Sequence, residues 1–199
     1  AVGALVGFRS PIGVARRVME ATPHVLLVGS GAAAFATAQG LEAVNDPVAY
    51  YTPAVARKVT PGELAHGTVG AVVRDIHGQL AAGTSTGGLL GKMAGRVGDT
   101  PLIGAGTWAD ERVAVSCTGQ GEYFMRAAVA VDVSCRMRYG GQSLAAASAG
   151  ALADMEVQGG DGGLIAVDAY GNVATPFVSE GMKRGIATSA GRFEVKTFR

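Results

Sequence analysis

The order of the expected elements most constrains the fold, because strand-forming segments stand on both sides of two consecutive helices. Tight turns are expected at His77-Gly78 and at residues 170–172. The expected strands of this part are residues 68–75, 79–85, 112–118, the two arms of a hairpin over 162–178, 185–190 and 192–198. The expected helices are residues 122–139 and 143–155. Two consecutive helices can cover stacked sheets, so the pattern predicts a mixed α/β (α+β) chain forming a four-layer αββα sandwich.

The N-terminal third alternates strand and helix. Ser10 can cap a helix over residues 10–22, and Pro11 suits its first turn, where no amide hydrogen is needed. The expected apolar stripe of this helix is Ile12, Ala15, Val18 and Met19. The other expected elements are buried strands over 1–8 and 24–28 and a helix over 31–39.

Two segments have no regular pattern. Residues 43–67 contain three prolines and no periodicity, which indicates an exposed, mobile linker. Residues 86–106 are too rich in glycine for a helix or a regular strand. A long structured loop of that kind commonly carries function.

The composition excludes several classes of protein. Only 17% of residues are charged, against about 25% in typical domains, which indicates much buried surface inside the domain or against a partner subunit. The net charge of +1 gives no case for binding nucleic acid or an anionic membrane. The longest uncharged run, residues 21–41, is interrupted by proline, histidine and glycine, so we expect no membrane span there.

The cysteines and the N-terminus bear on location and processing. Cys117 and Cys135 lie in apolar segments without metal-ligand spacing, which indicates buried thiols in a reducing compartment and predicts a cytoplasmic protein. The chain opens in an apolar run without Met and shows no signal-peptide pattern. We therefore expect a processed chain or a fragment.

The Gly67-Thr68 pair marks a candidate cleavage site. A threonine hydroxyl is a weak nucleophile unless a base lies beside it, and a free α-amino group on the same residue can be that base. Such a role requires cleavage between Gly67 and Thr68, where glycine permits strained backbone geometry and close approach to the carbonyl. Threonine at the start of a strand is common, so this residue alone is weak evidence.

The neighbouring sequence strengthens the case. "GTSTGGLLGKMAGRVGDTPLIGAG" followed by "VSCTGQGEYFMR" resembles the plant-type L-asparaginase and isoaspartyl aminopeptidase family of N-terminal-nucleophile hydrolases. The resemblance covers nearly the whole chain and is densest over residues 66–126. It implies the αββα fold of these hydrolases, here N-terminally incomplete.

The resemblance implies roles for individual residues. Thr68 matches the nucleophile, and Thr86 matches a threonine whose hydroxyl bonds to the nucleophile's oxygen. Thr118 and Gly119 match an oxyanion hole made from a hydroxyl and a backbone N–H. The implied substrate-binding residues are Arg96 for the α-carboxylate, Asp99 for the α-ammonium, and Gly119 and Gly121 beside them. An ion pair between Arg96 and Asp99 and a helix-entry turn at the glycines are the structural alternatives.

The resemblance also implies an activity and an assembly. The expected reaction hydrolyses L-asparagine, or removes isoaspartyl residues from peptides, without a metal or organic cofactor; the family's sodium-binding loop would lie in a segment that this sequence lacks. Self-cleavage would divide a single domain, residues 1–199, into a partial α-subunit (1–67) and a β-subunit (68–199). Two such αβ pairs would form a dimer. "AVVRD" departs from the family by placing Arg74 where relatives usually carry an aliphatic residue.

Two alternatives stay open. Gly29, Gly31 and Ala34 fit a G-x-G-x-x-A pattern between a strand and a helix, which can bind the pyrophosphate of a dinucleotide. No strand ending in a ribose-binding acid follows them. The other alternative is a non-catalytic remnant of the family.

Overall fold

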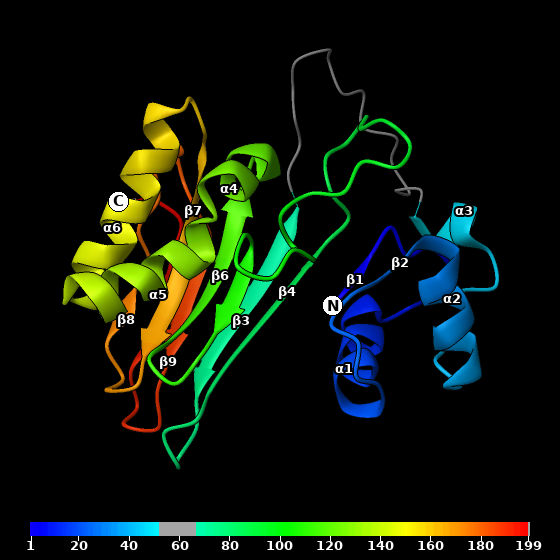
Figure 1. The fold of residues 1–199 in the computed structure, drawn as a ribbon, viewed down its shortest axis with the longest axis horizontal. Coiled ribbons are helices and arrows are strands. Elements are labelled where there is room, and N and C mark those ends of the chain that lie inside the picture. The colour runs from blue at the N-terminus through cyan, green and yellow to red at the C-terminus, as the bar shows by residue number, and fades with distance from the viewer. Residues whose placement is uncertain (52–66, 199) are drawn as a thin grey trace. The chain divides into compact units, whose positions relative to one another are not determined.

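A computed structural model describes residues 1–51 and 67–198 (Figure 1). Its contacts divide the chain into two compact units: residues 1–67 with 87–97, and residues 68–86 with 98–199. The second unit thus begins at Thr68, the residue that follows the predicted cleavage site. Most of the expected linker lies outside the described residues, but its start differs from expectation, because Pro47–Tyr51 forms a short helix, α3.

The first unit joins two short parallel strands to helices. It contains β1 (Val2–Gly3), α1 (Pro11–Ala21), β2 (Leu27–Val28) and α2 (Gly29–Ala38), with β1 paired to β2. Both strands are shorter than expected, and β1 stops where Ala4 adopts a positive φ of 50°. The Ser10 hydroxyl accepts a hydrogen bond from Gly13 N–H at 3.3 Å, which confirms the predicted cap of α1.

The buried face of α1 differs from the predicted stripe. Val14 and Val18 are fully buried, whereas Ile12 and Met19 are exposed. Val14 instead joins Phe8 and Ala36 in the small core of the first unit. The choice between two candidate stripes on one helix depends on where the chain before and after it packs, which periodicity alone does not determine.

The second unit is a mixed α/β assembly. Its strands are β3 (Thr68–Arg74), β4 (Leu80–Thr86), β5 (Thr107–Ala109), β6 (Val113–Gly119), β7 (Gly162–Asp168), β8 (Val173–Ala174), β9 (Arg184–Ala187) and β10 (Phe193–Lys196). Its helices are α4 (Gly121–Ala127), α5 (Val129–Gly140) and α6 (Leu144–Val157). β3 and β4 form one antiparallel hairpin, β9 and β10 another, and β5-β6-β7-β8 an antiparallel sheet. The expected hairpins and strands are confirmed, while β5 is an addition.

The four-stranded sheet contacts helices and the β3–β4 hairpin with different residues. Val113, Val115 and Cys117 of β6 belong to a core that also includes buried side chains of α4, α5 and α6. Because side chains alternate along a strand, the residues between them point the other way. There β3 and β4 pack against β5, β6 and β7, as Figure 1 shows for the second unit. The helices therefore pack on one face of this sheet and the β3–β4 hairpin on the other, and successive residues of β6 point to the two faces in turn.

The helix expected over 122–139 is broken at Ala128. This residue has left-handed angles, φ 47° and ψ 44°, and separates α4 from α5. The first N–H groups of a helix have no partner inside it, and here loop carbonyls accept two of them. Ala130 N–H donates to Ala105 O at 3.2 Å and Val131 N–H to Gly104 O at 2.9 Å. Hydrogen bonds at the break thus connect α5 to the glycine-rich loop. Because this cause of the break is a tertiary contact, the periodicity of the sequence does not reveal it.

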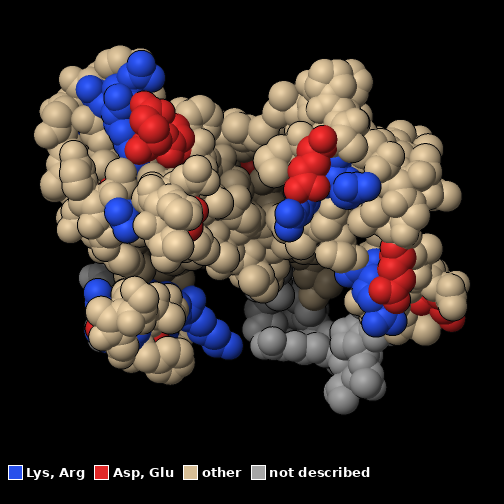
Figure 2. Space-filling model, turned by 90° about the horizontal axis from the view of Figure 1, so that it is seen from below, with Lys and Arg blue, Asp and Glu red and all other residues tan. Residues whose placement is uncertain are grey.

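The surface charges stand in mixed groups. On the face drawn in Figure 2, basic and acidic side chains lie side by side, and neither sign forms a broad field. The ion pairs of the described residues include Arg16 with Glu20 and Arg136 with Asp132. Within the described residues, none of the helices is both long enough and apolar enough to cross a bilayer.

Candidate active site

The β3–β4 hairpin brings the first two predicted threonines together. Thr68 and Thr86 are opposite each other at the open end of the hairpin, and the Thr68 hydroxyl donates a hydrogen bond to Thr86 Oγ1 at 3.4 Å. Asp75 closes the other end, because its Oδ1 accepts N–H groups of His77 and Gln79, both at 2.8 Å. The eighteen-residue separation of the two threonines is therefore set by the register of one hairpin.

A second row of hydroxyls shows which way these threonines face. Thr84 is paired with Gly70 one pleat away, and its Oγ1 lies 2.7 Å from Ser116 Oγ of β6. A Cβ built on Gly70 would overlap the same Ser116 oxygen. Residues 68, 70, 84 and 86 therefore turn one face of the hairpin toward β6.

The same alternation places Thr118. It follows Ser116 by two residues in β6, so both point to the face of the sheet that meets the hairpin. Thr68, Thr86 and Thr118 thus lie on facing surfaces, one pleat beyond the Thr84–Ser116 contact. Within the part of the chain that the structure describes, no hydrogen bond of the Thr118 hydroxyl is found. That hydroxyl is half-buried and available to a ligand.

Gly119 has a clear structural reason to be glycine. It is paired with Gly162 across β6 and β7, and both residues have φ +149°. A Cβ on Gly119 would lie 2.7 Å from Phe124 Cε2 and 2.8 Å from Gly162 Cα. Only glycine fits this crossing. Gly121 is the buried first residue of α4, so the helix-entry reading of this segment is confirmed, beside any role in binding.

Asp99 is buried in the loop between β4 and β5. It is only 7% exposed, and its Oδ2 has no accessible surface of note. Its backbone carbonyl accepts N–H groups of Leu102 at 2.9 Å and Gly106 at 3.2 Å, which fixes the loop. Burial, together with the negative charge of Asp99, raises the pKa of the Cys117 thiol well above its ordinary value. Asp99 therefore lies near β6, to which Gly106 joins it: Gly106 N–H donates to Asp99 O, and Cys117 N–H donates to Gly106 O.

Arg96 and Gly67 belong to the other compact unit. Arg96 is half-buried in residues 87–97, where its N–H donates to Met93 O at 3.1 Å. Gly67 is exposed, and no described atom would lie within 4 Å of a Cβ built on it. Crowding by the described residues therefore does not explain the glycine at position 67. The role of Arg96 stays a prediction.

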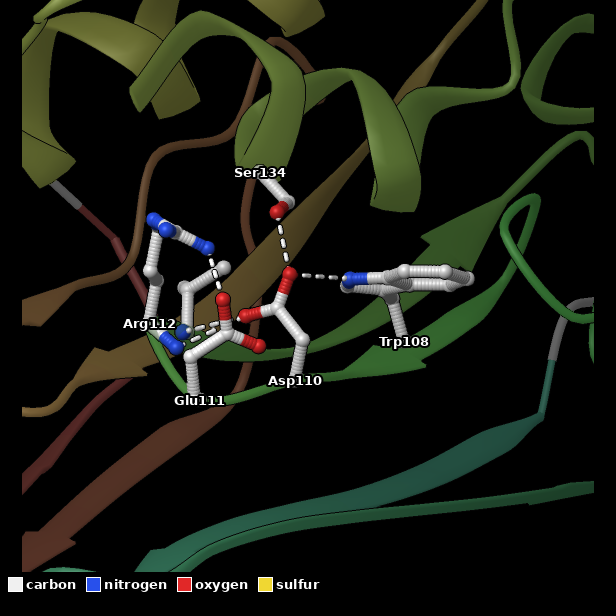
Figure 3. Close-up of polar contacts among 6 residues, drawn as sticks. Trp108, Asp110, Glu111, Arg112 and Ser134 are labelled. Carbon is white, nitrogen blue, oxygen red and sulfur yellow. Dashed lines mark hydrogen bonds and ion pairs between the residues drawn. The ribbon is translucent and has the colours of Figure 1, made fainter. Parts of the chain in front are cut away.

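A partly buried carboxylate that sequence reasoning missed holds β5, β6 and α5 together. Asp110 Oδ2 accepts hydrogen bonds from Trp108 Nε1 at 3.0 Å and from the Ser134 hydroxyl, and its Oδ1 accepts two backbone N–H groups (Figure 3). Burial acts to raise the pKa of Asp110, but these four hydrogen bonds outweigh it and lower the pKa below its ordinary value. Asp110 is thus a structural anchor whose ionised form these hydrogen bonds favour.

Arg74 receives a structural explanation. Its Nε donates to Ala169 O at 2.7 Å, so the guanidinium joins the β3–β4 hairpin to the turn between β7 and β8. The same turn is ordered by Asp168, which accepts hydrogen bonds from Tyr170 and Asn172. A charged side chain at position 74 therefore supports the contact between hairpin and sheet.

Neither a metal centre nor a dinucleotide loop is found in the described residues. No group of three or more His, Cys, Asp or Glu side chains gathers there as a metal would need. β2 ends at Val28 and α2 begins at Gly29, so no loop residue separates the strand from the helix. A glycine-rich phosphate loop needs such residues. The arrangement around Gly29 and Gly31 does not favour dinucleotide binding.

The sequence carries a signal for the two rows of hydroxyls that was not used. Thr84 and Thr86 in one expected strand, and Ser116 and Thr118 in another, repeat a hydroxyl at a spacing of two. That spacing puts each pair on one face, a signal that could have identified Thr84 and Ser116 from the sequence.

Comparison with known proteins identifies the family of this chain. The asparaginase family model matches residues 1–60 and 51–197. The chain is 49% identical over 203 residues to an isoaspartyl peptidase of Salmonella typhimurium, covering 92% of this chain and 64% of that protein. An Escherichia coli isoaspartyl peptidase is 47% identical (92% and 63% covered), and a plant-type L-asparaginase of Pyrococcus horikoshii 42% identical (87% and 63%). The chain therefore spans less than two thirds of the length of these relatives. It belongs to the asparaginase family that includes isoaspartyl peptidases and plant-type L-asparaginases.

Proposed function

We propose that this chain is a self-cleaving threonine hydrolase that acts on L-asparagine, on isoaspartyl peptides, or on both. The observation that carries the proposal is the meeting of Thr68 and Thr86 at the hairpin end, facing the strand that bears Thr118. The relatives' names give the substrate class.

The first step would cleave the chain. Thr68 Oγ1 attacks the carbonyl carbon of Gly67, and the peptide bond breaks as an ester forms. The proton of the hydroxyl passes to the departing nitrogen. This shift frees the α-amino group of Thr68. Water then hydrolyses the ester, which frees the carboxylate of Gly67 and restores the hydroxyl of Thr68. Before this step the nitrogen of Thr68 is an amide and cannot act as a base.

The second step would use the freed amine. It accepts the proton of Thr68 Oγ1 while that oxygen attacks the side-chain amide carbon of the substrate, and Thr86 holds the nucleophile's oxygen in place. The Thr118 hydroxyl and Gly119 N–H would stabilise the developing oxyanion, donors worth about 3–4 kcal/mol each. Ammonia or an amino acid leaves, and water releases aspartate from the ester on Thr68.

Recognition of the substrate's α-groups would fall to Arg96 and Asp99, with Gly121 beside them. A planar guanidinium suits a carboxylate, and a buried carboxylate suits an ammonium. Four-layer αββα packing and a dimer of αβ pairs are further parts of the proposal, as is a cytoplasmic location.

Hydrolysis assays test the activity. Wild type, Thr68→Ala and Thr68→Ser are incubated with L-asparagine and with a β-aspartyl dipeptide, and released aspartate is measured. The proposal expects activity in the wild type, a reduced rate with serine and none with alanine. Equal hydrolysis by wild type and Thr68→Ala would refute it, and a wild type that neither cleaves nor hydrolyses would support the remnant alternative.

A further inference from the structure

We infer that a chain of three hydroxyls, Thr107–Thr84–Ser116, of which the last two are buried, positions the nucleophile's hairpin against the strand that carries Thr118. The inference rests on the proposed function and concerns residues to which that function assigns no role. It makes Thr84, Ser116 and Thr107 positioning residues.

The hydroxyl chain is an unbroken series of hydrogen bonds. Thr107 Oγ1 of β5 donates to Thr84 Oγ1 at 2.5 Å, and Thr84 Oγ1 lies 2.7 Å from Ser116 Oγ. Thr84 is 9% and Ser116 3% exposed, so water competes little for these bonds. The three residues come from β4, β5 and β6, and the hydrogen bonds therefore link the hairpin to two strands of the sheet.

The partners of the hydroxyls support a fixed arrangement. Thr107 Oγ1 can donate to Thr84 Oγ1 or, at 3.4 Å, to Thr100 O, and either Thr84 or Ser116 can donate in the contact between them. Each hydroxyl in the row has a defined partner, whereas apolar side chains would slide over one another. Buried, satisfied hydrogen bonds specify one arrangement of the elements that they join.

The hydroxyl chain lies one pleat away from the proposed catalytic residues, on the same strands. Thr84 is two residues from Thr86, Ser116 is two from Thr118, and Gly70, which admits the Ser116 oxygen, is two from Thr68. Residues two apart on one strand face are about 7 Å apart, so the three hydroxyls lie close enough to influence the positions of Thr68, Thr86 and Thr118. An error of about 1 Å in the position of a reacting group can cost about 100-fold in rate.

The test compares the loss of a hydroxyl within the hydroxyl chain with the loss of a buried hydroxyl outside it. Thr84→Val and Ser116→Ala remove the chain's bonds at nearly constant volume, and Thr84→Ser restores the hydroxyl. Ser148→Ala is the matched control, because Ser148 is equally buried in α6 and its hydroxyl has no hydrogen bond within the described residues. Each full-length variant is followed for self-cleavage by intact mass, for kcat and KM, and for Tm.

The expected result separates positioning from stability. Thr84→Val and Ser116→Ala should slow self-cleavage and lower kcat by about 10- to 100-fold with KM nearly unchanged, at temperatures well below Tm. Thr84→Ser should regain most of the rate, and Ser148→Ala should cleave as wild type does. A lowered Tm with unchanged cleavage and kcat would overturn the inference, because the hydroxyls would then be structural only.

Crystal structures of wild type and Thr84→Val decide the inference independently of activity. A larger separation between the Cα atoms of Thr68 and Thr118 in Thr84→Val supports it, and an unchanged separation overturns it. If wild type itself does not cleave, the proposed function fails, while this comparison still shows whether the hydroxyl chain fixes the two threonines.

Discussion

Gly70→Ala is the substitution that most severely tests how the hairpin packs on the sheet. The added Cβ would overlap Ser116 Oγ and lie 3.0 Å from Ser116 Cβ, whereas two carbon atoms normally approach to about 3.5–4.0 Å. Rotating Ser116 away would remove the overlap with its oxygen but break the 2.7 Å contact with Thr84. The residual carbon–carbon clash would still push β3 from β6 by about half an ångström.

The expected cost follows from these two effects. Loss of one buried hydrogen bond costs about 1 kcal/mol, and overpacking costs about 1–3 kcal/mol. We therefore expect the free energy of unfolding to fall by about 2–4 kcal/mol, which lowers Tm by about 5–15 °C in a chain of this size. Chemical denaturation and thermal melting followed by circular dichroism measure both.

The matched partner is Ser116→Gly, because it removes both clashing atoms. The next atom that the new Cβ would meet is Gly83 O, at an ordinary 3.9 Å. The double variant should therefore lose less stability than the sum of the single variants, by about 1–2 kcal/mol in a double-mutant cycle. Strictly additive losses would refute the reasoning, since they would mean that Ser116 does not occupy the space above Gly70.

Three further predictions concern the ionisable groups Asp110 and Cys117. Asp110→Asn should destabilise the chain by about 2–4 kcal/mol in chemical denaturation, because an amide cannot accept all four of the hydrogen bonds that Asp110 accepts; an unchanged midpoint would contradict this role. Because its pKa is lower in the folded chain, Asp110 adds stability above its unfolded pKa, near 3.8, and this contribution should vanish as the pH falls through the lower folded value. A wild-type minus Asp110→Asn difference that is constant from pH 7 to pH 2 would exclude it. Cys117 should resist a thiol reagent at pH 8 in the native chain and react on unfolding, since burial and Asp99 raise its pKa, and rapid native labelling in a variant lacking Cys135 would disprove the burial.

Local signals were sufficient to predict the hairpins and the cap at Ser10. His77-Gly78 and Tyr170 to Asn172 carry turn residues between strand-forming runs, and the structure has turns at both places. Ser10 accepts an N–H group at the start of α1, and Ser143, for which no cap was predicted, does the same at the start of α6. These features depend on residues close together in the sequence, so a single chain reveals them.

The features that were missed depend on distant partners. Ala128 takes a left-handed conformation because loop carbonyls at 104 and 105 bind the start of α5, and alanine gives no sign of a break. Arg74 has meaning only beside Ala169, ninety-five residues away. The site was predicted through a family resemblance. The spacing of the hydroxyls is visible in the sequence, but the contact between Thr84 and Ser116 appears only when β4 and β6 are placed face to face.

Intact-mass measurement of the purified chain tests the central claim most directly. The account predicts that the full chain disappears with time and that two products replace it, one ending at Gly67 and one whose N-terminal residue is Thr68, while Thr68→Ala stays whole. A wild-type chain that remains uncut over the same period, or products that begin at any other residue, would contradict it.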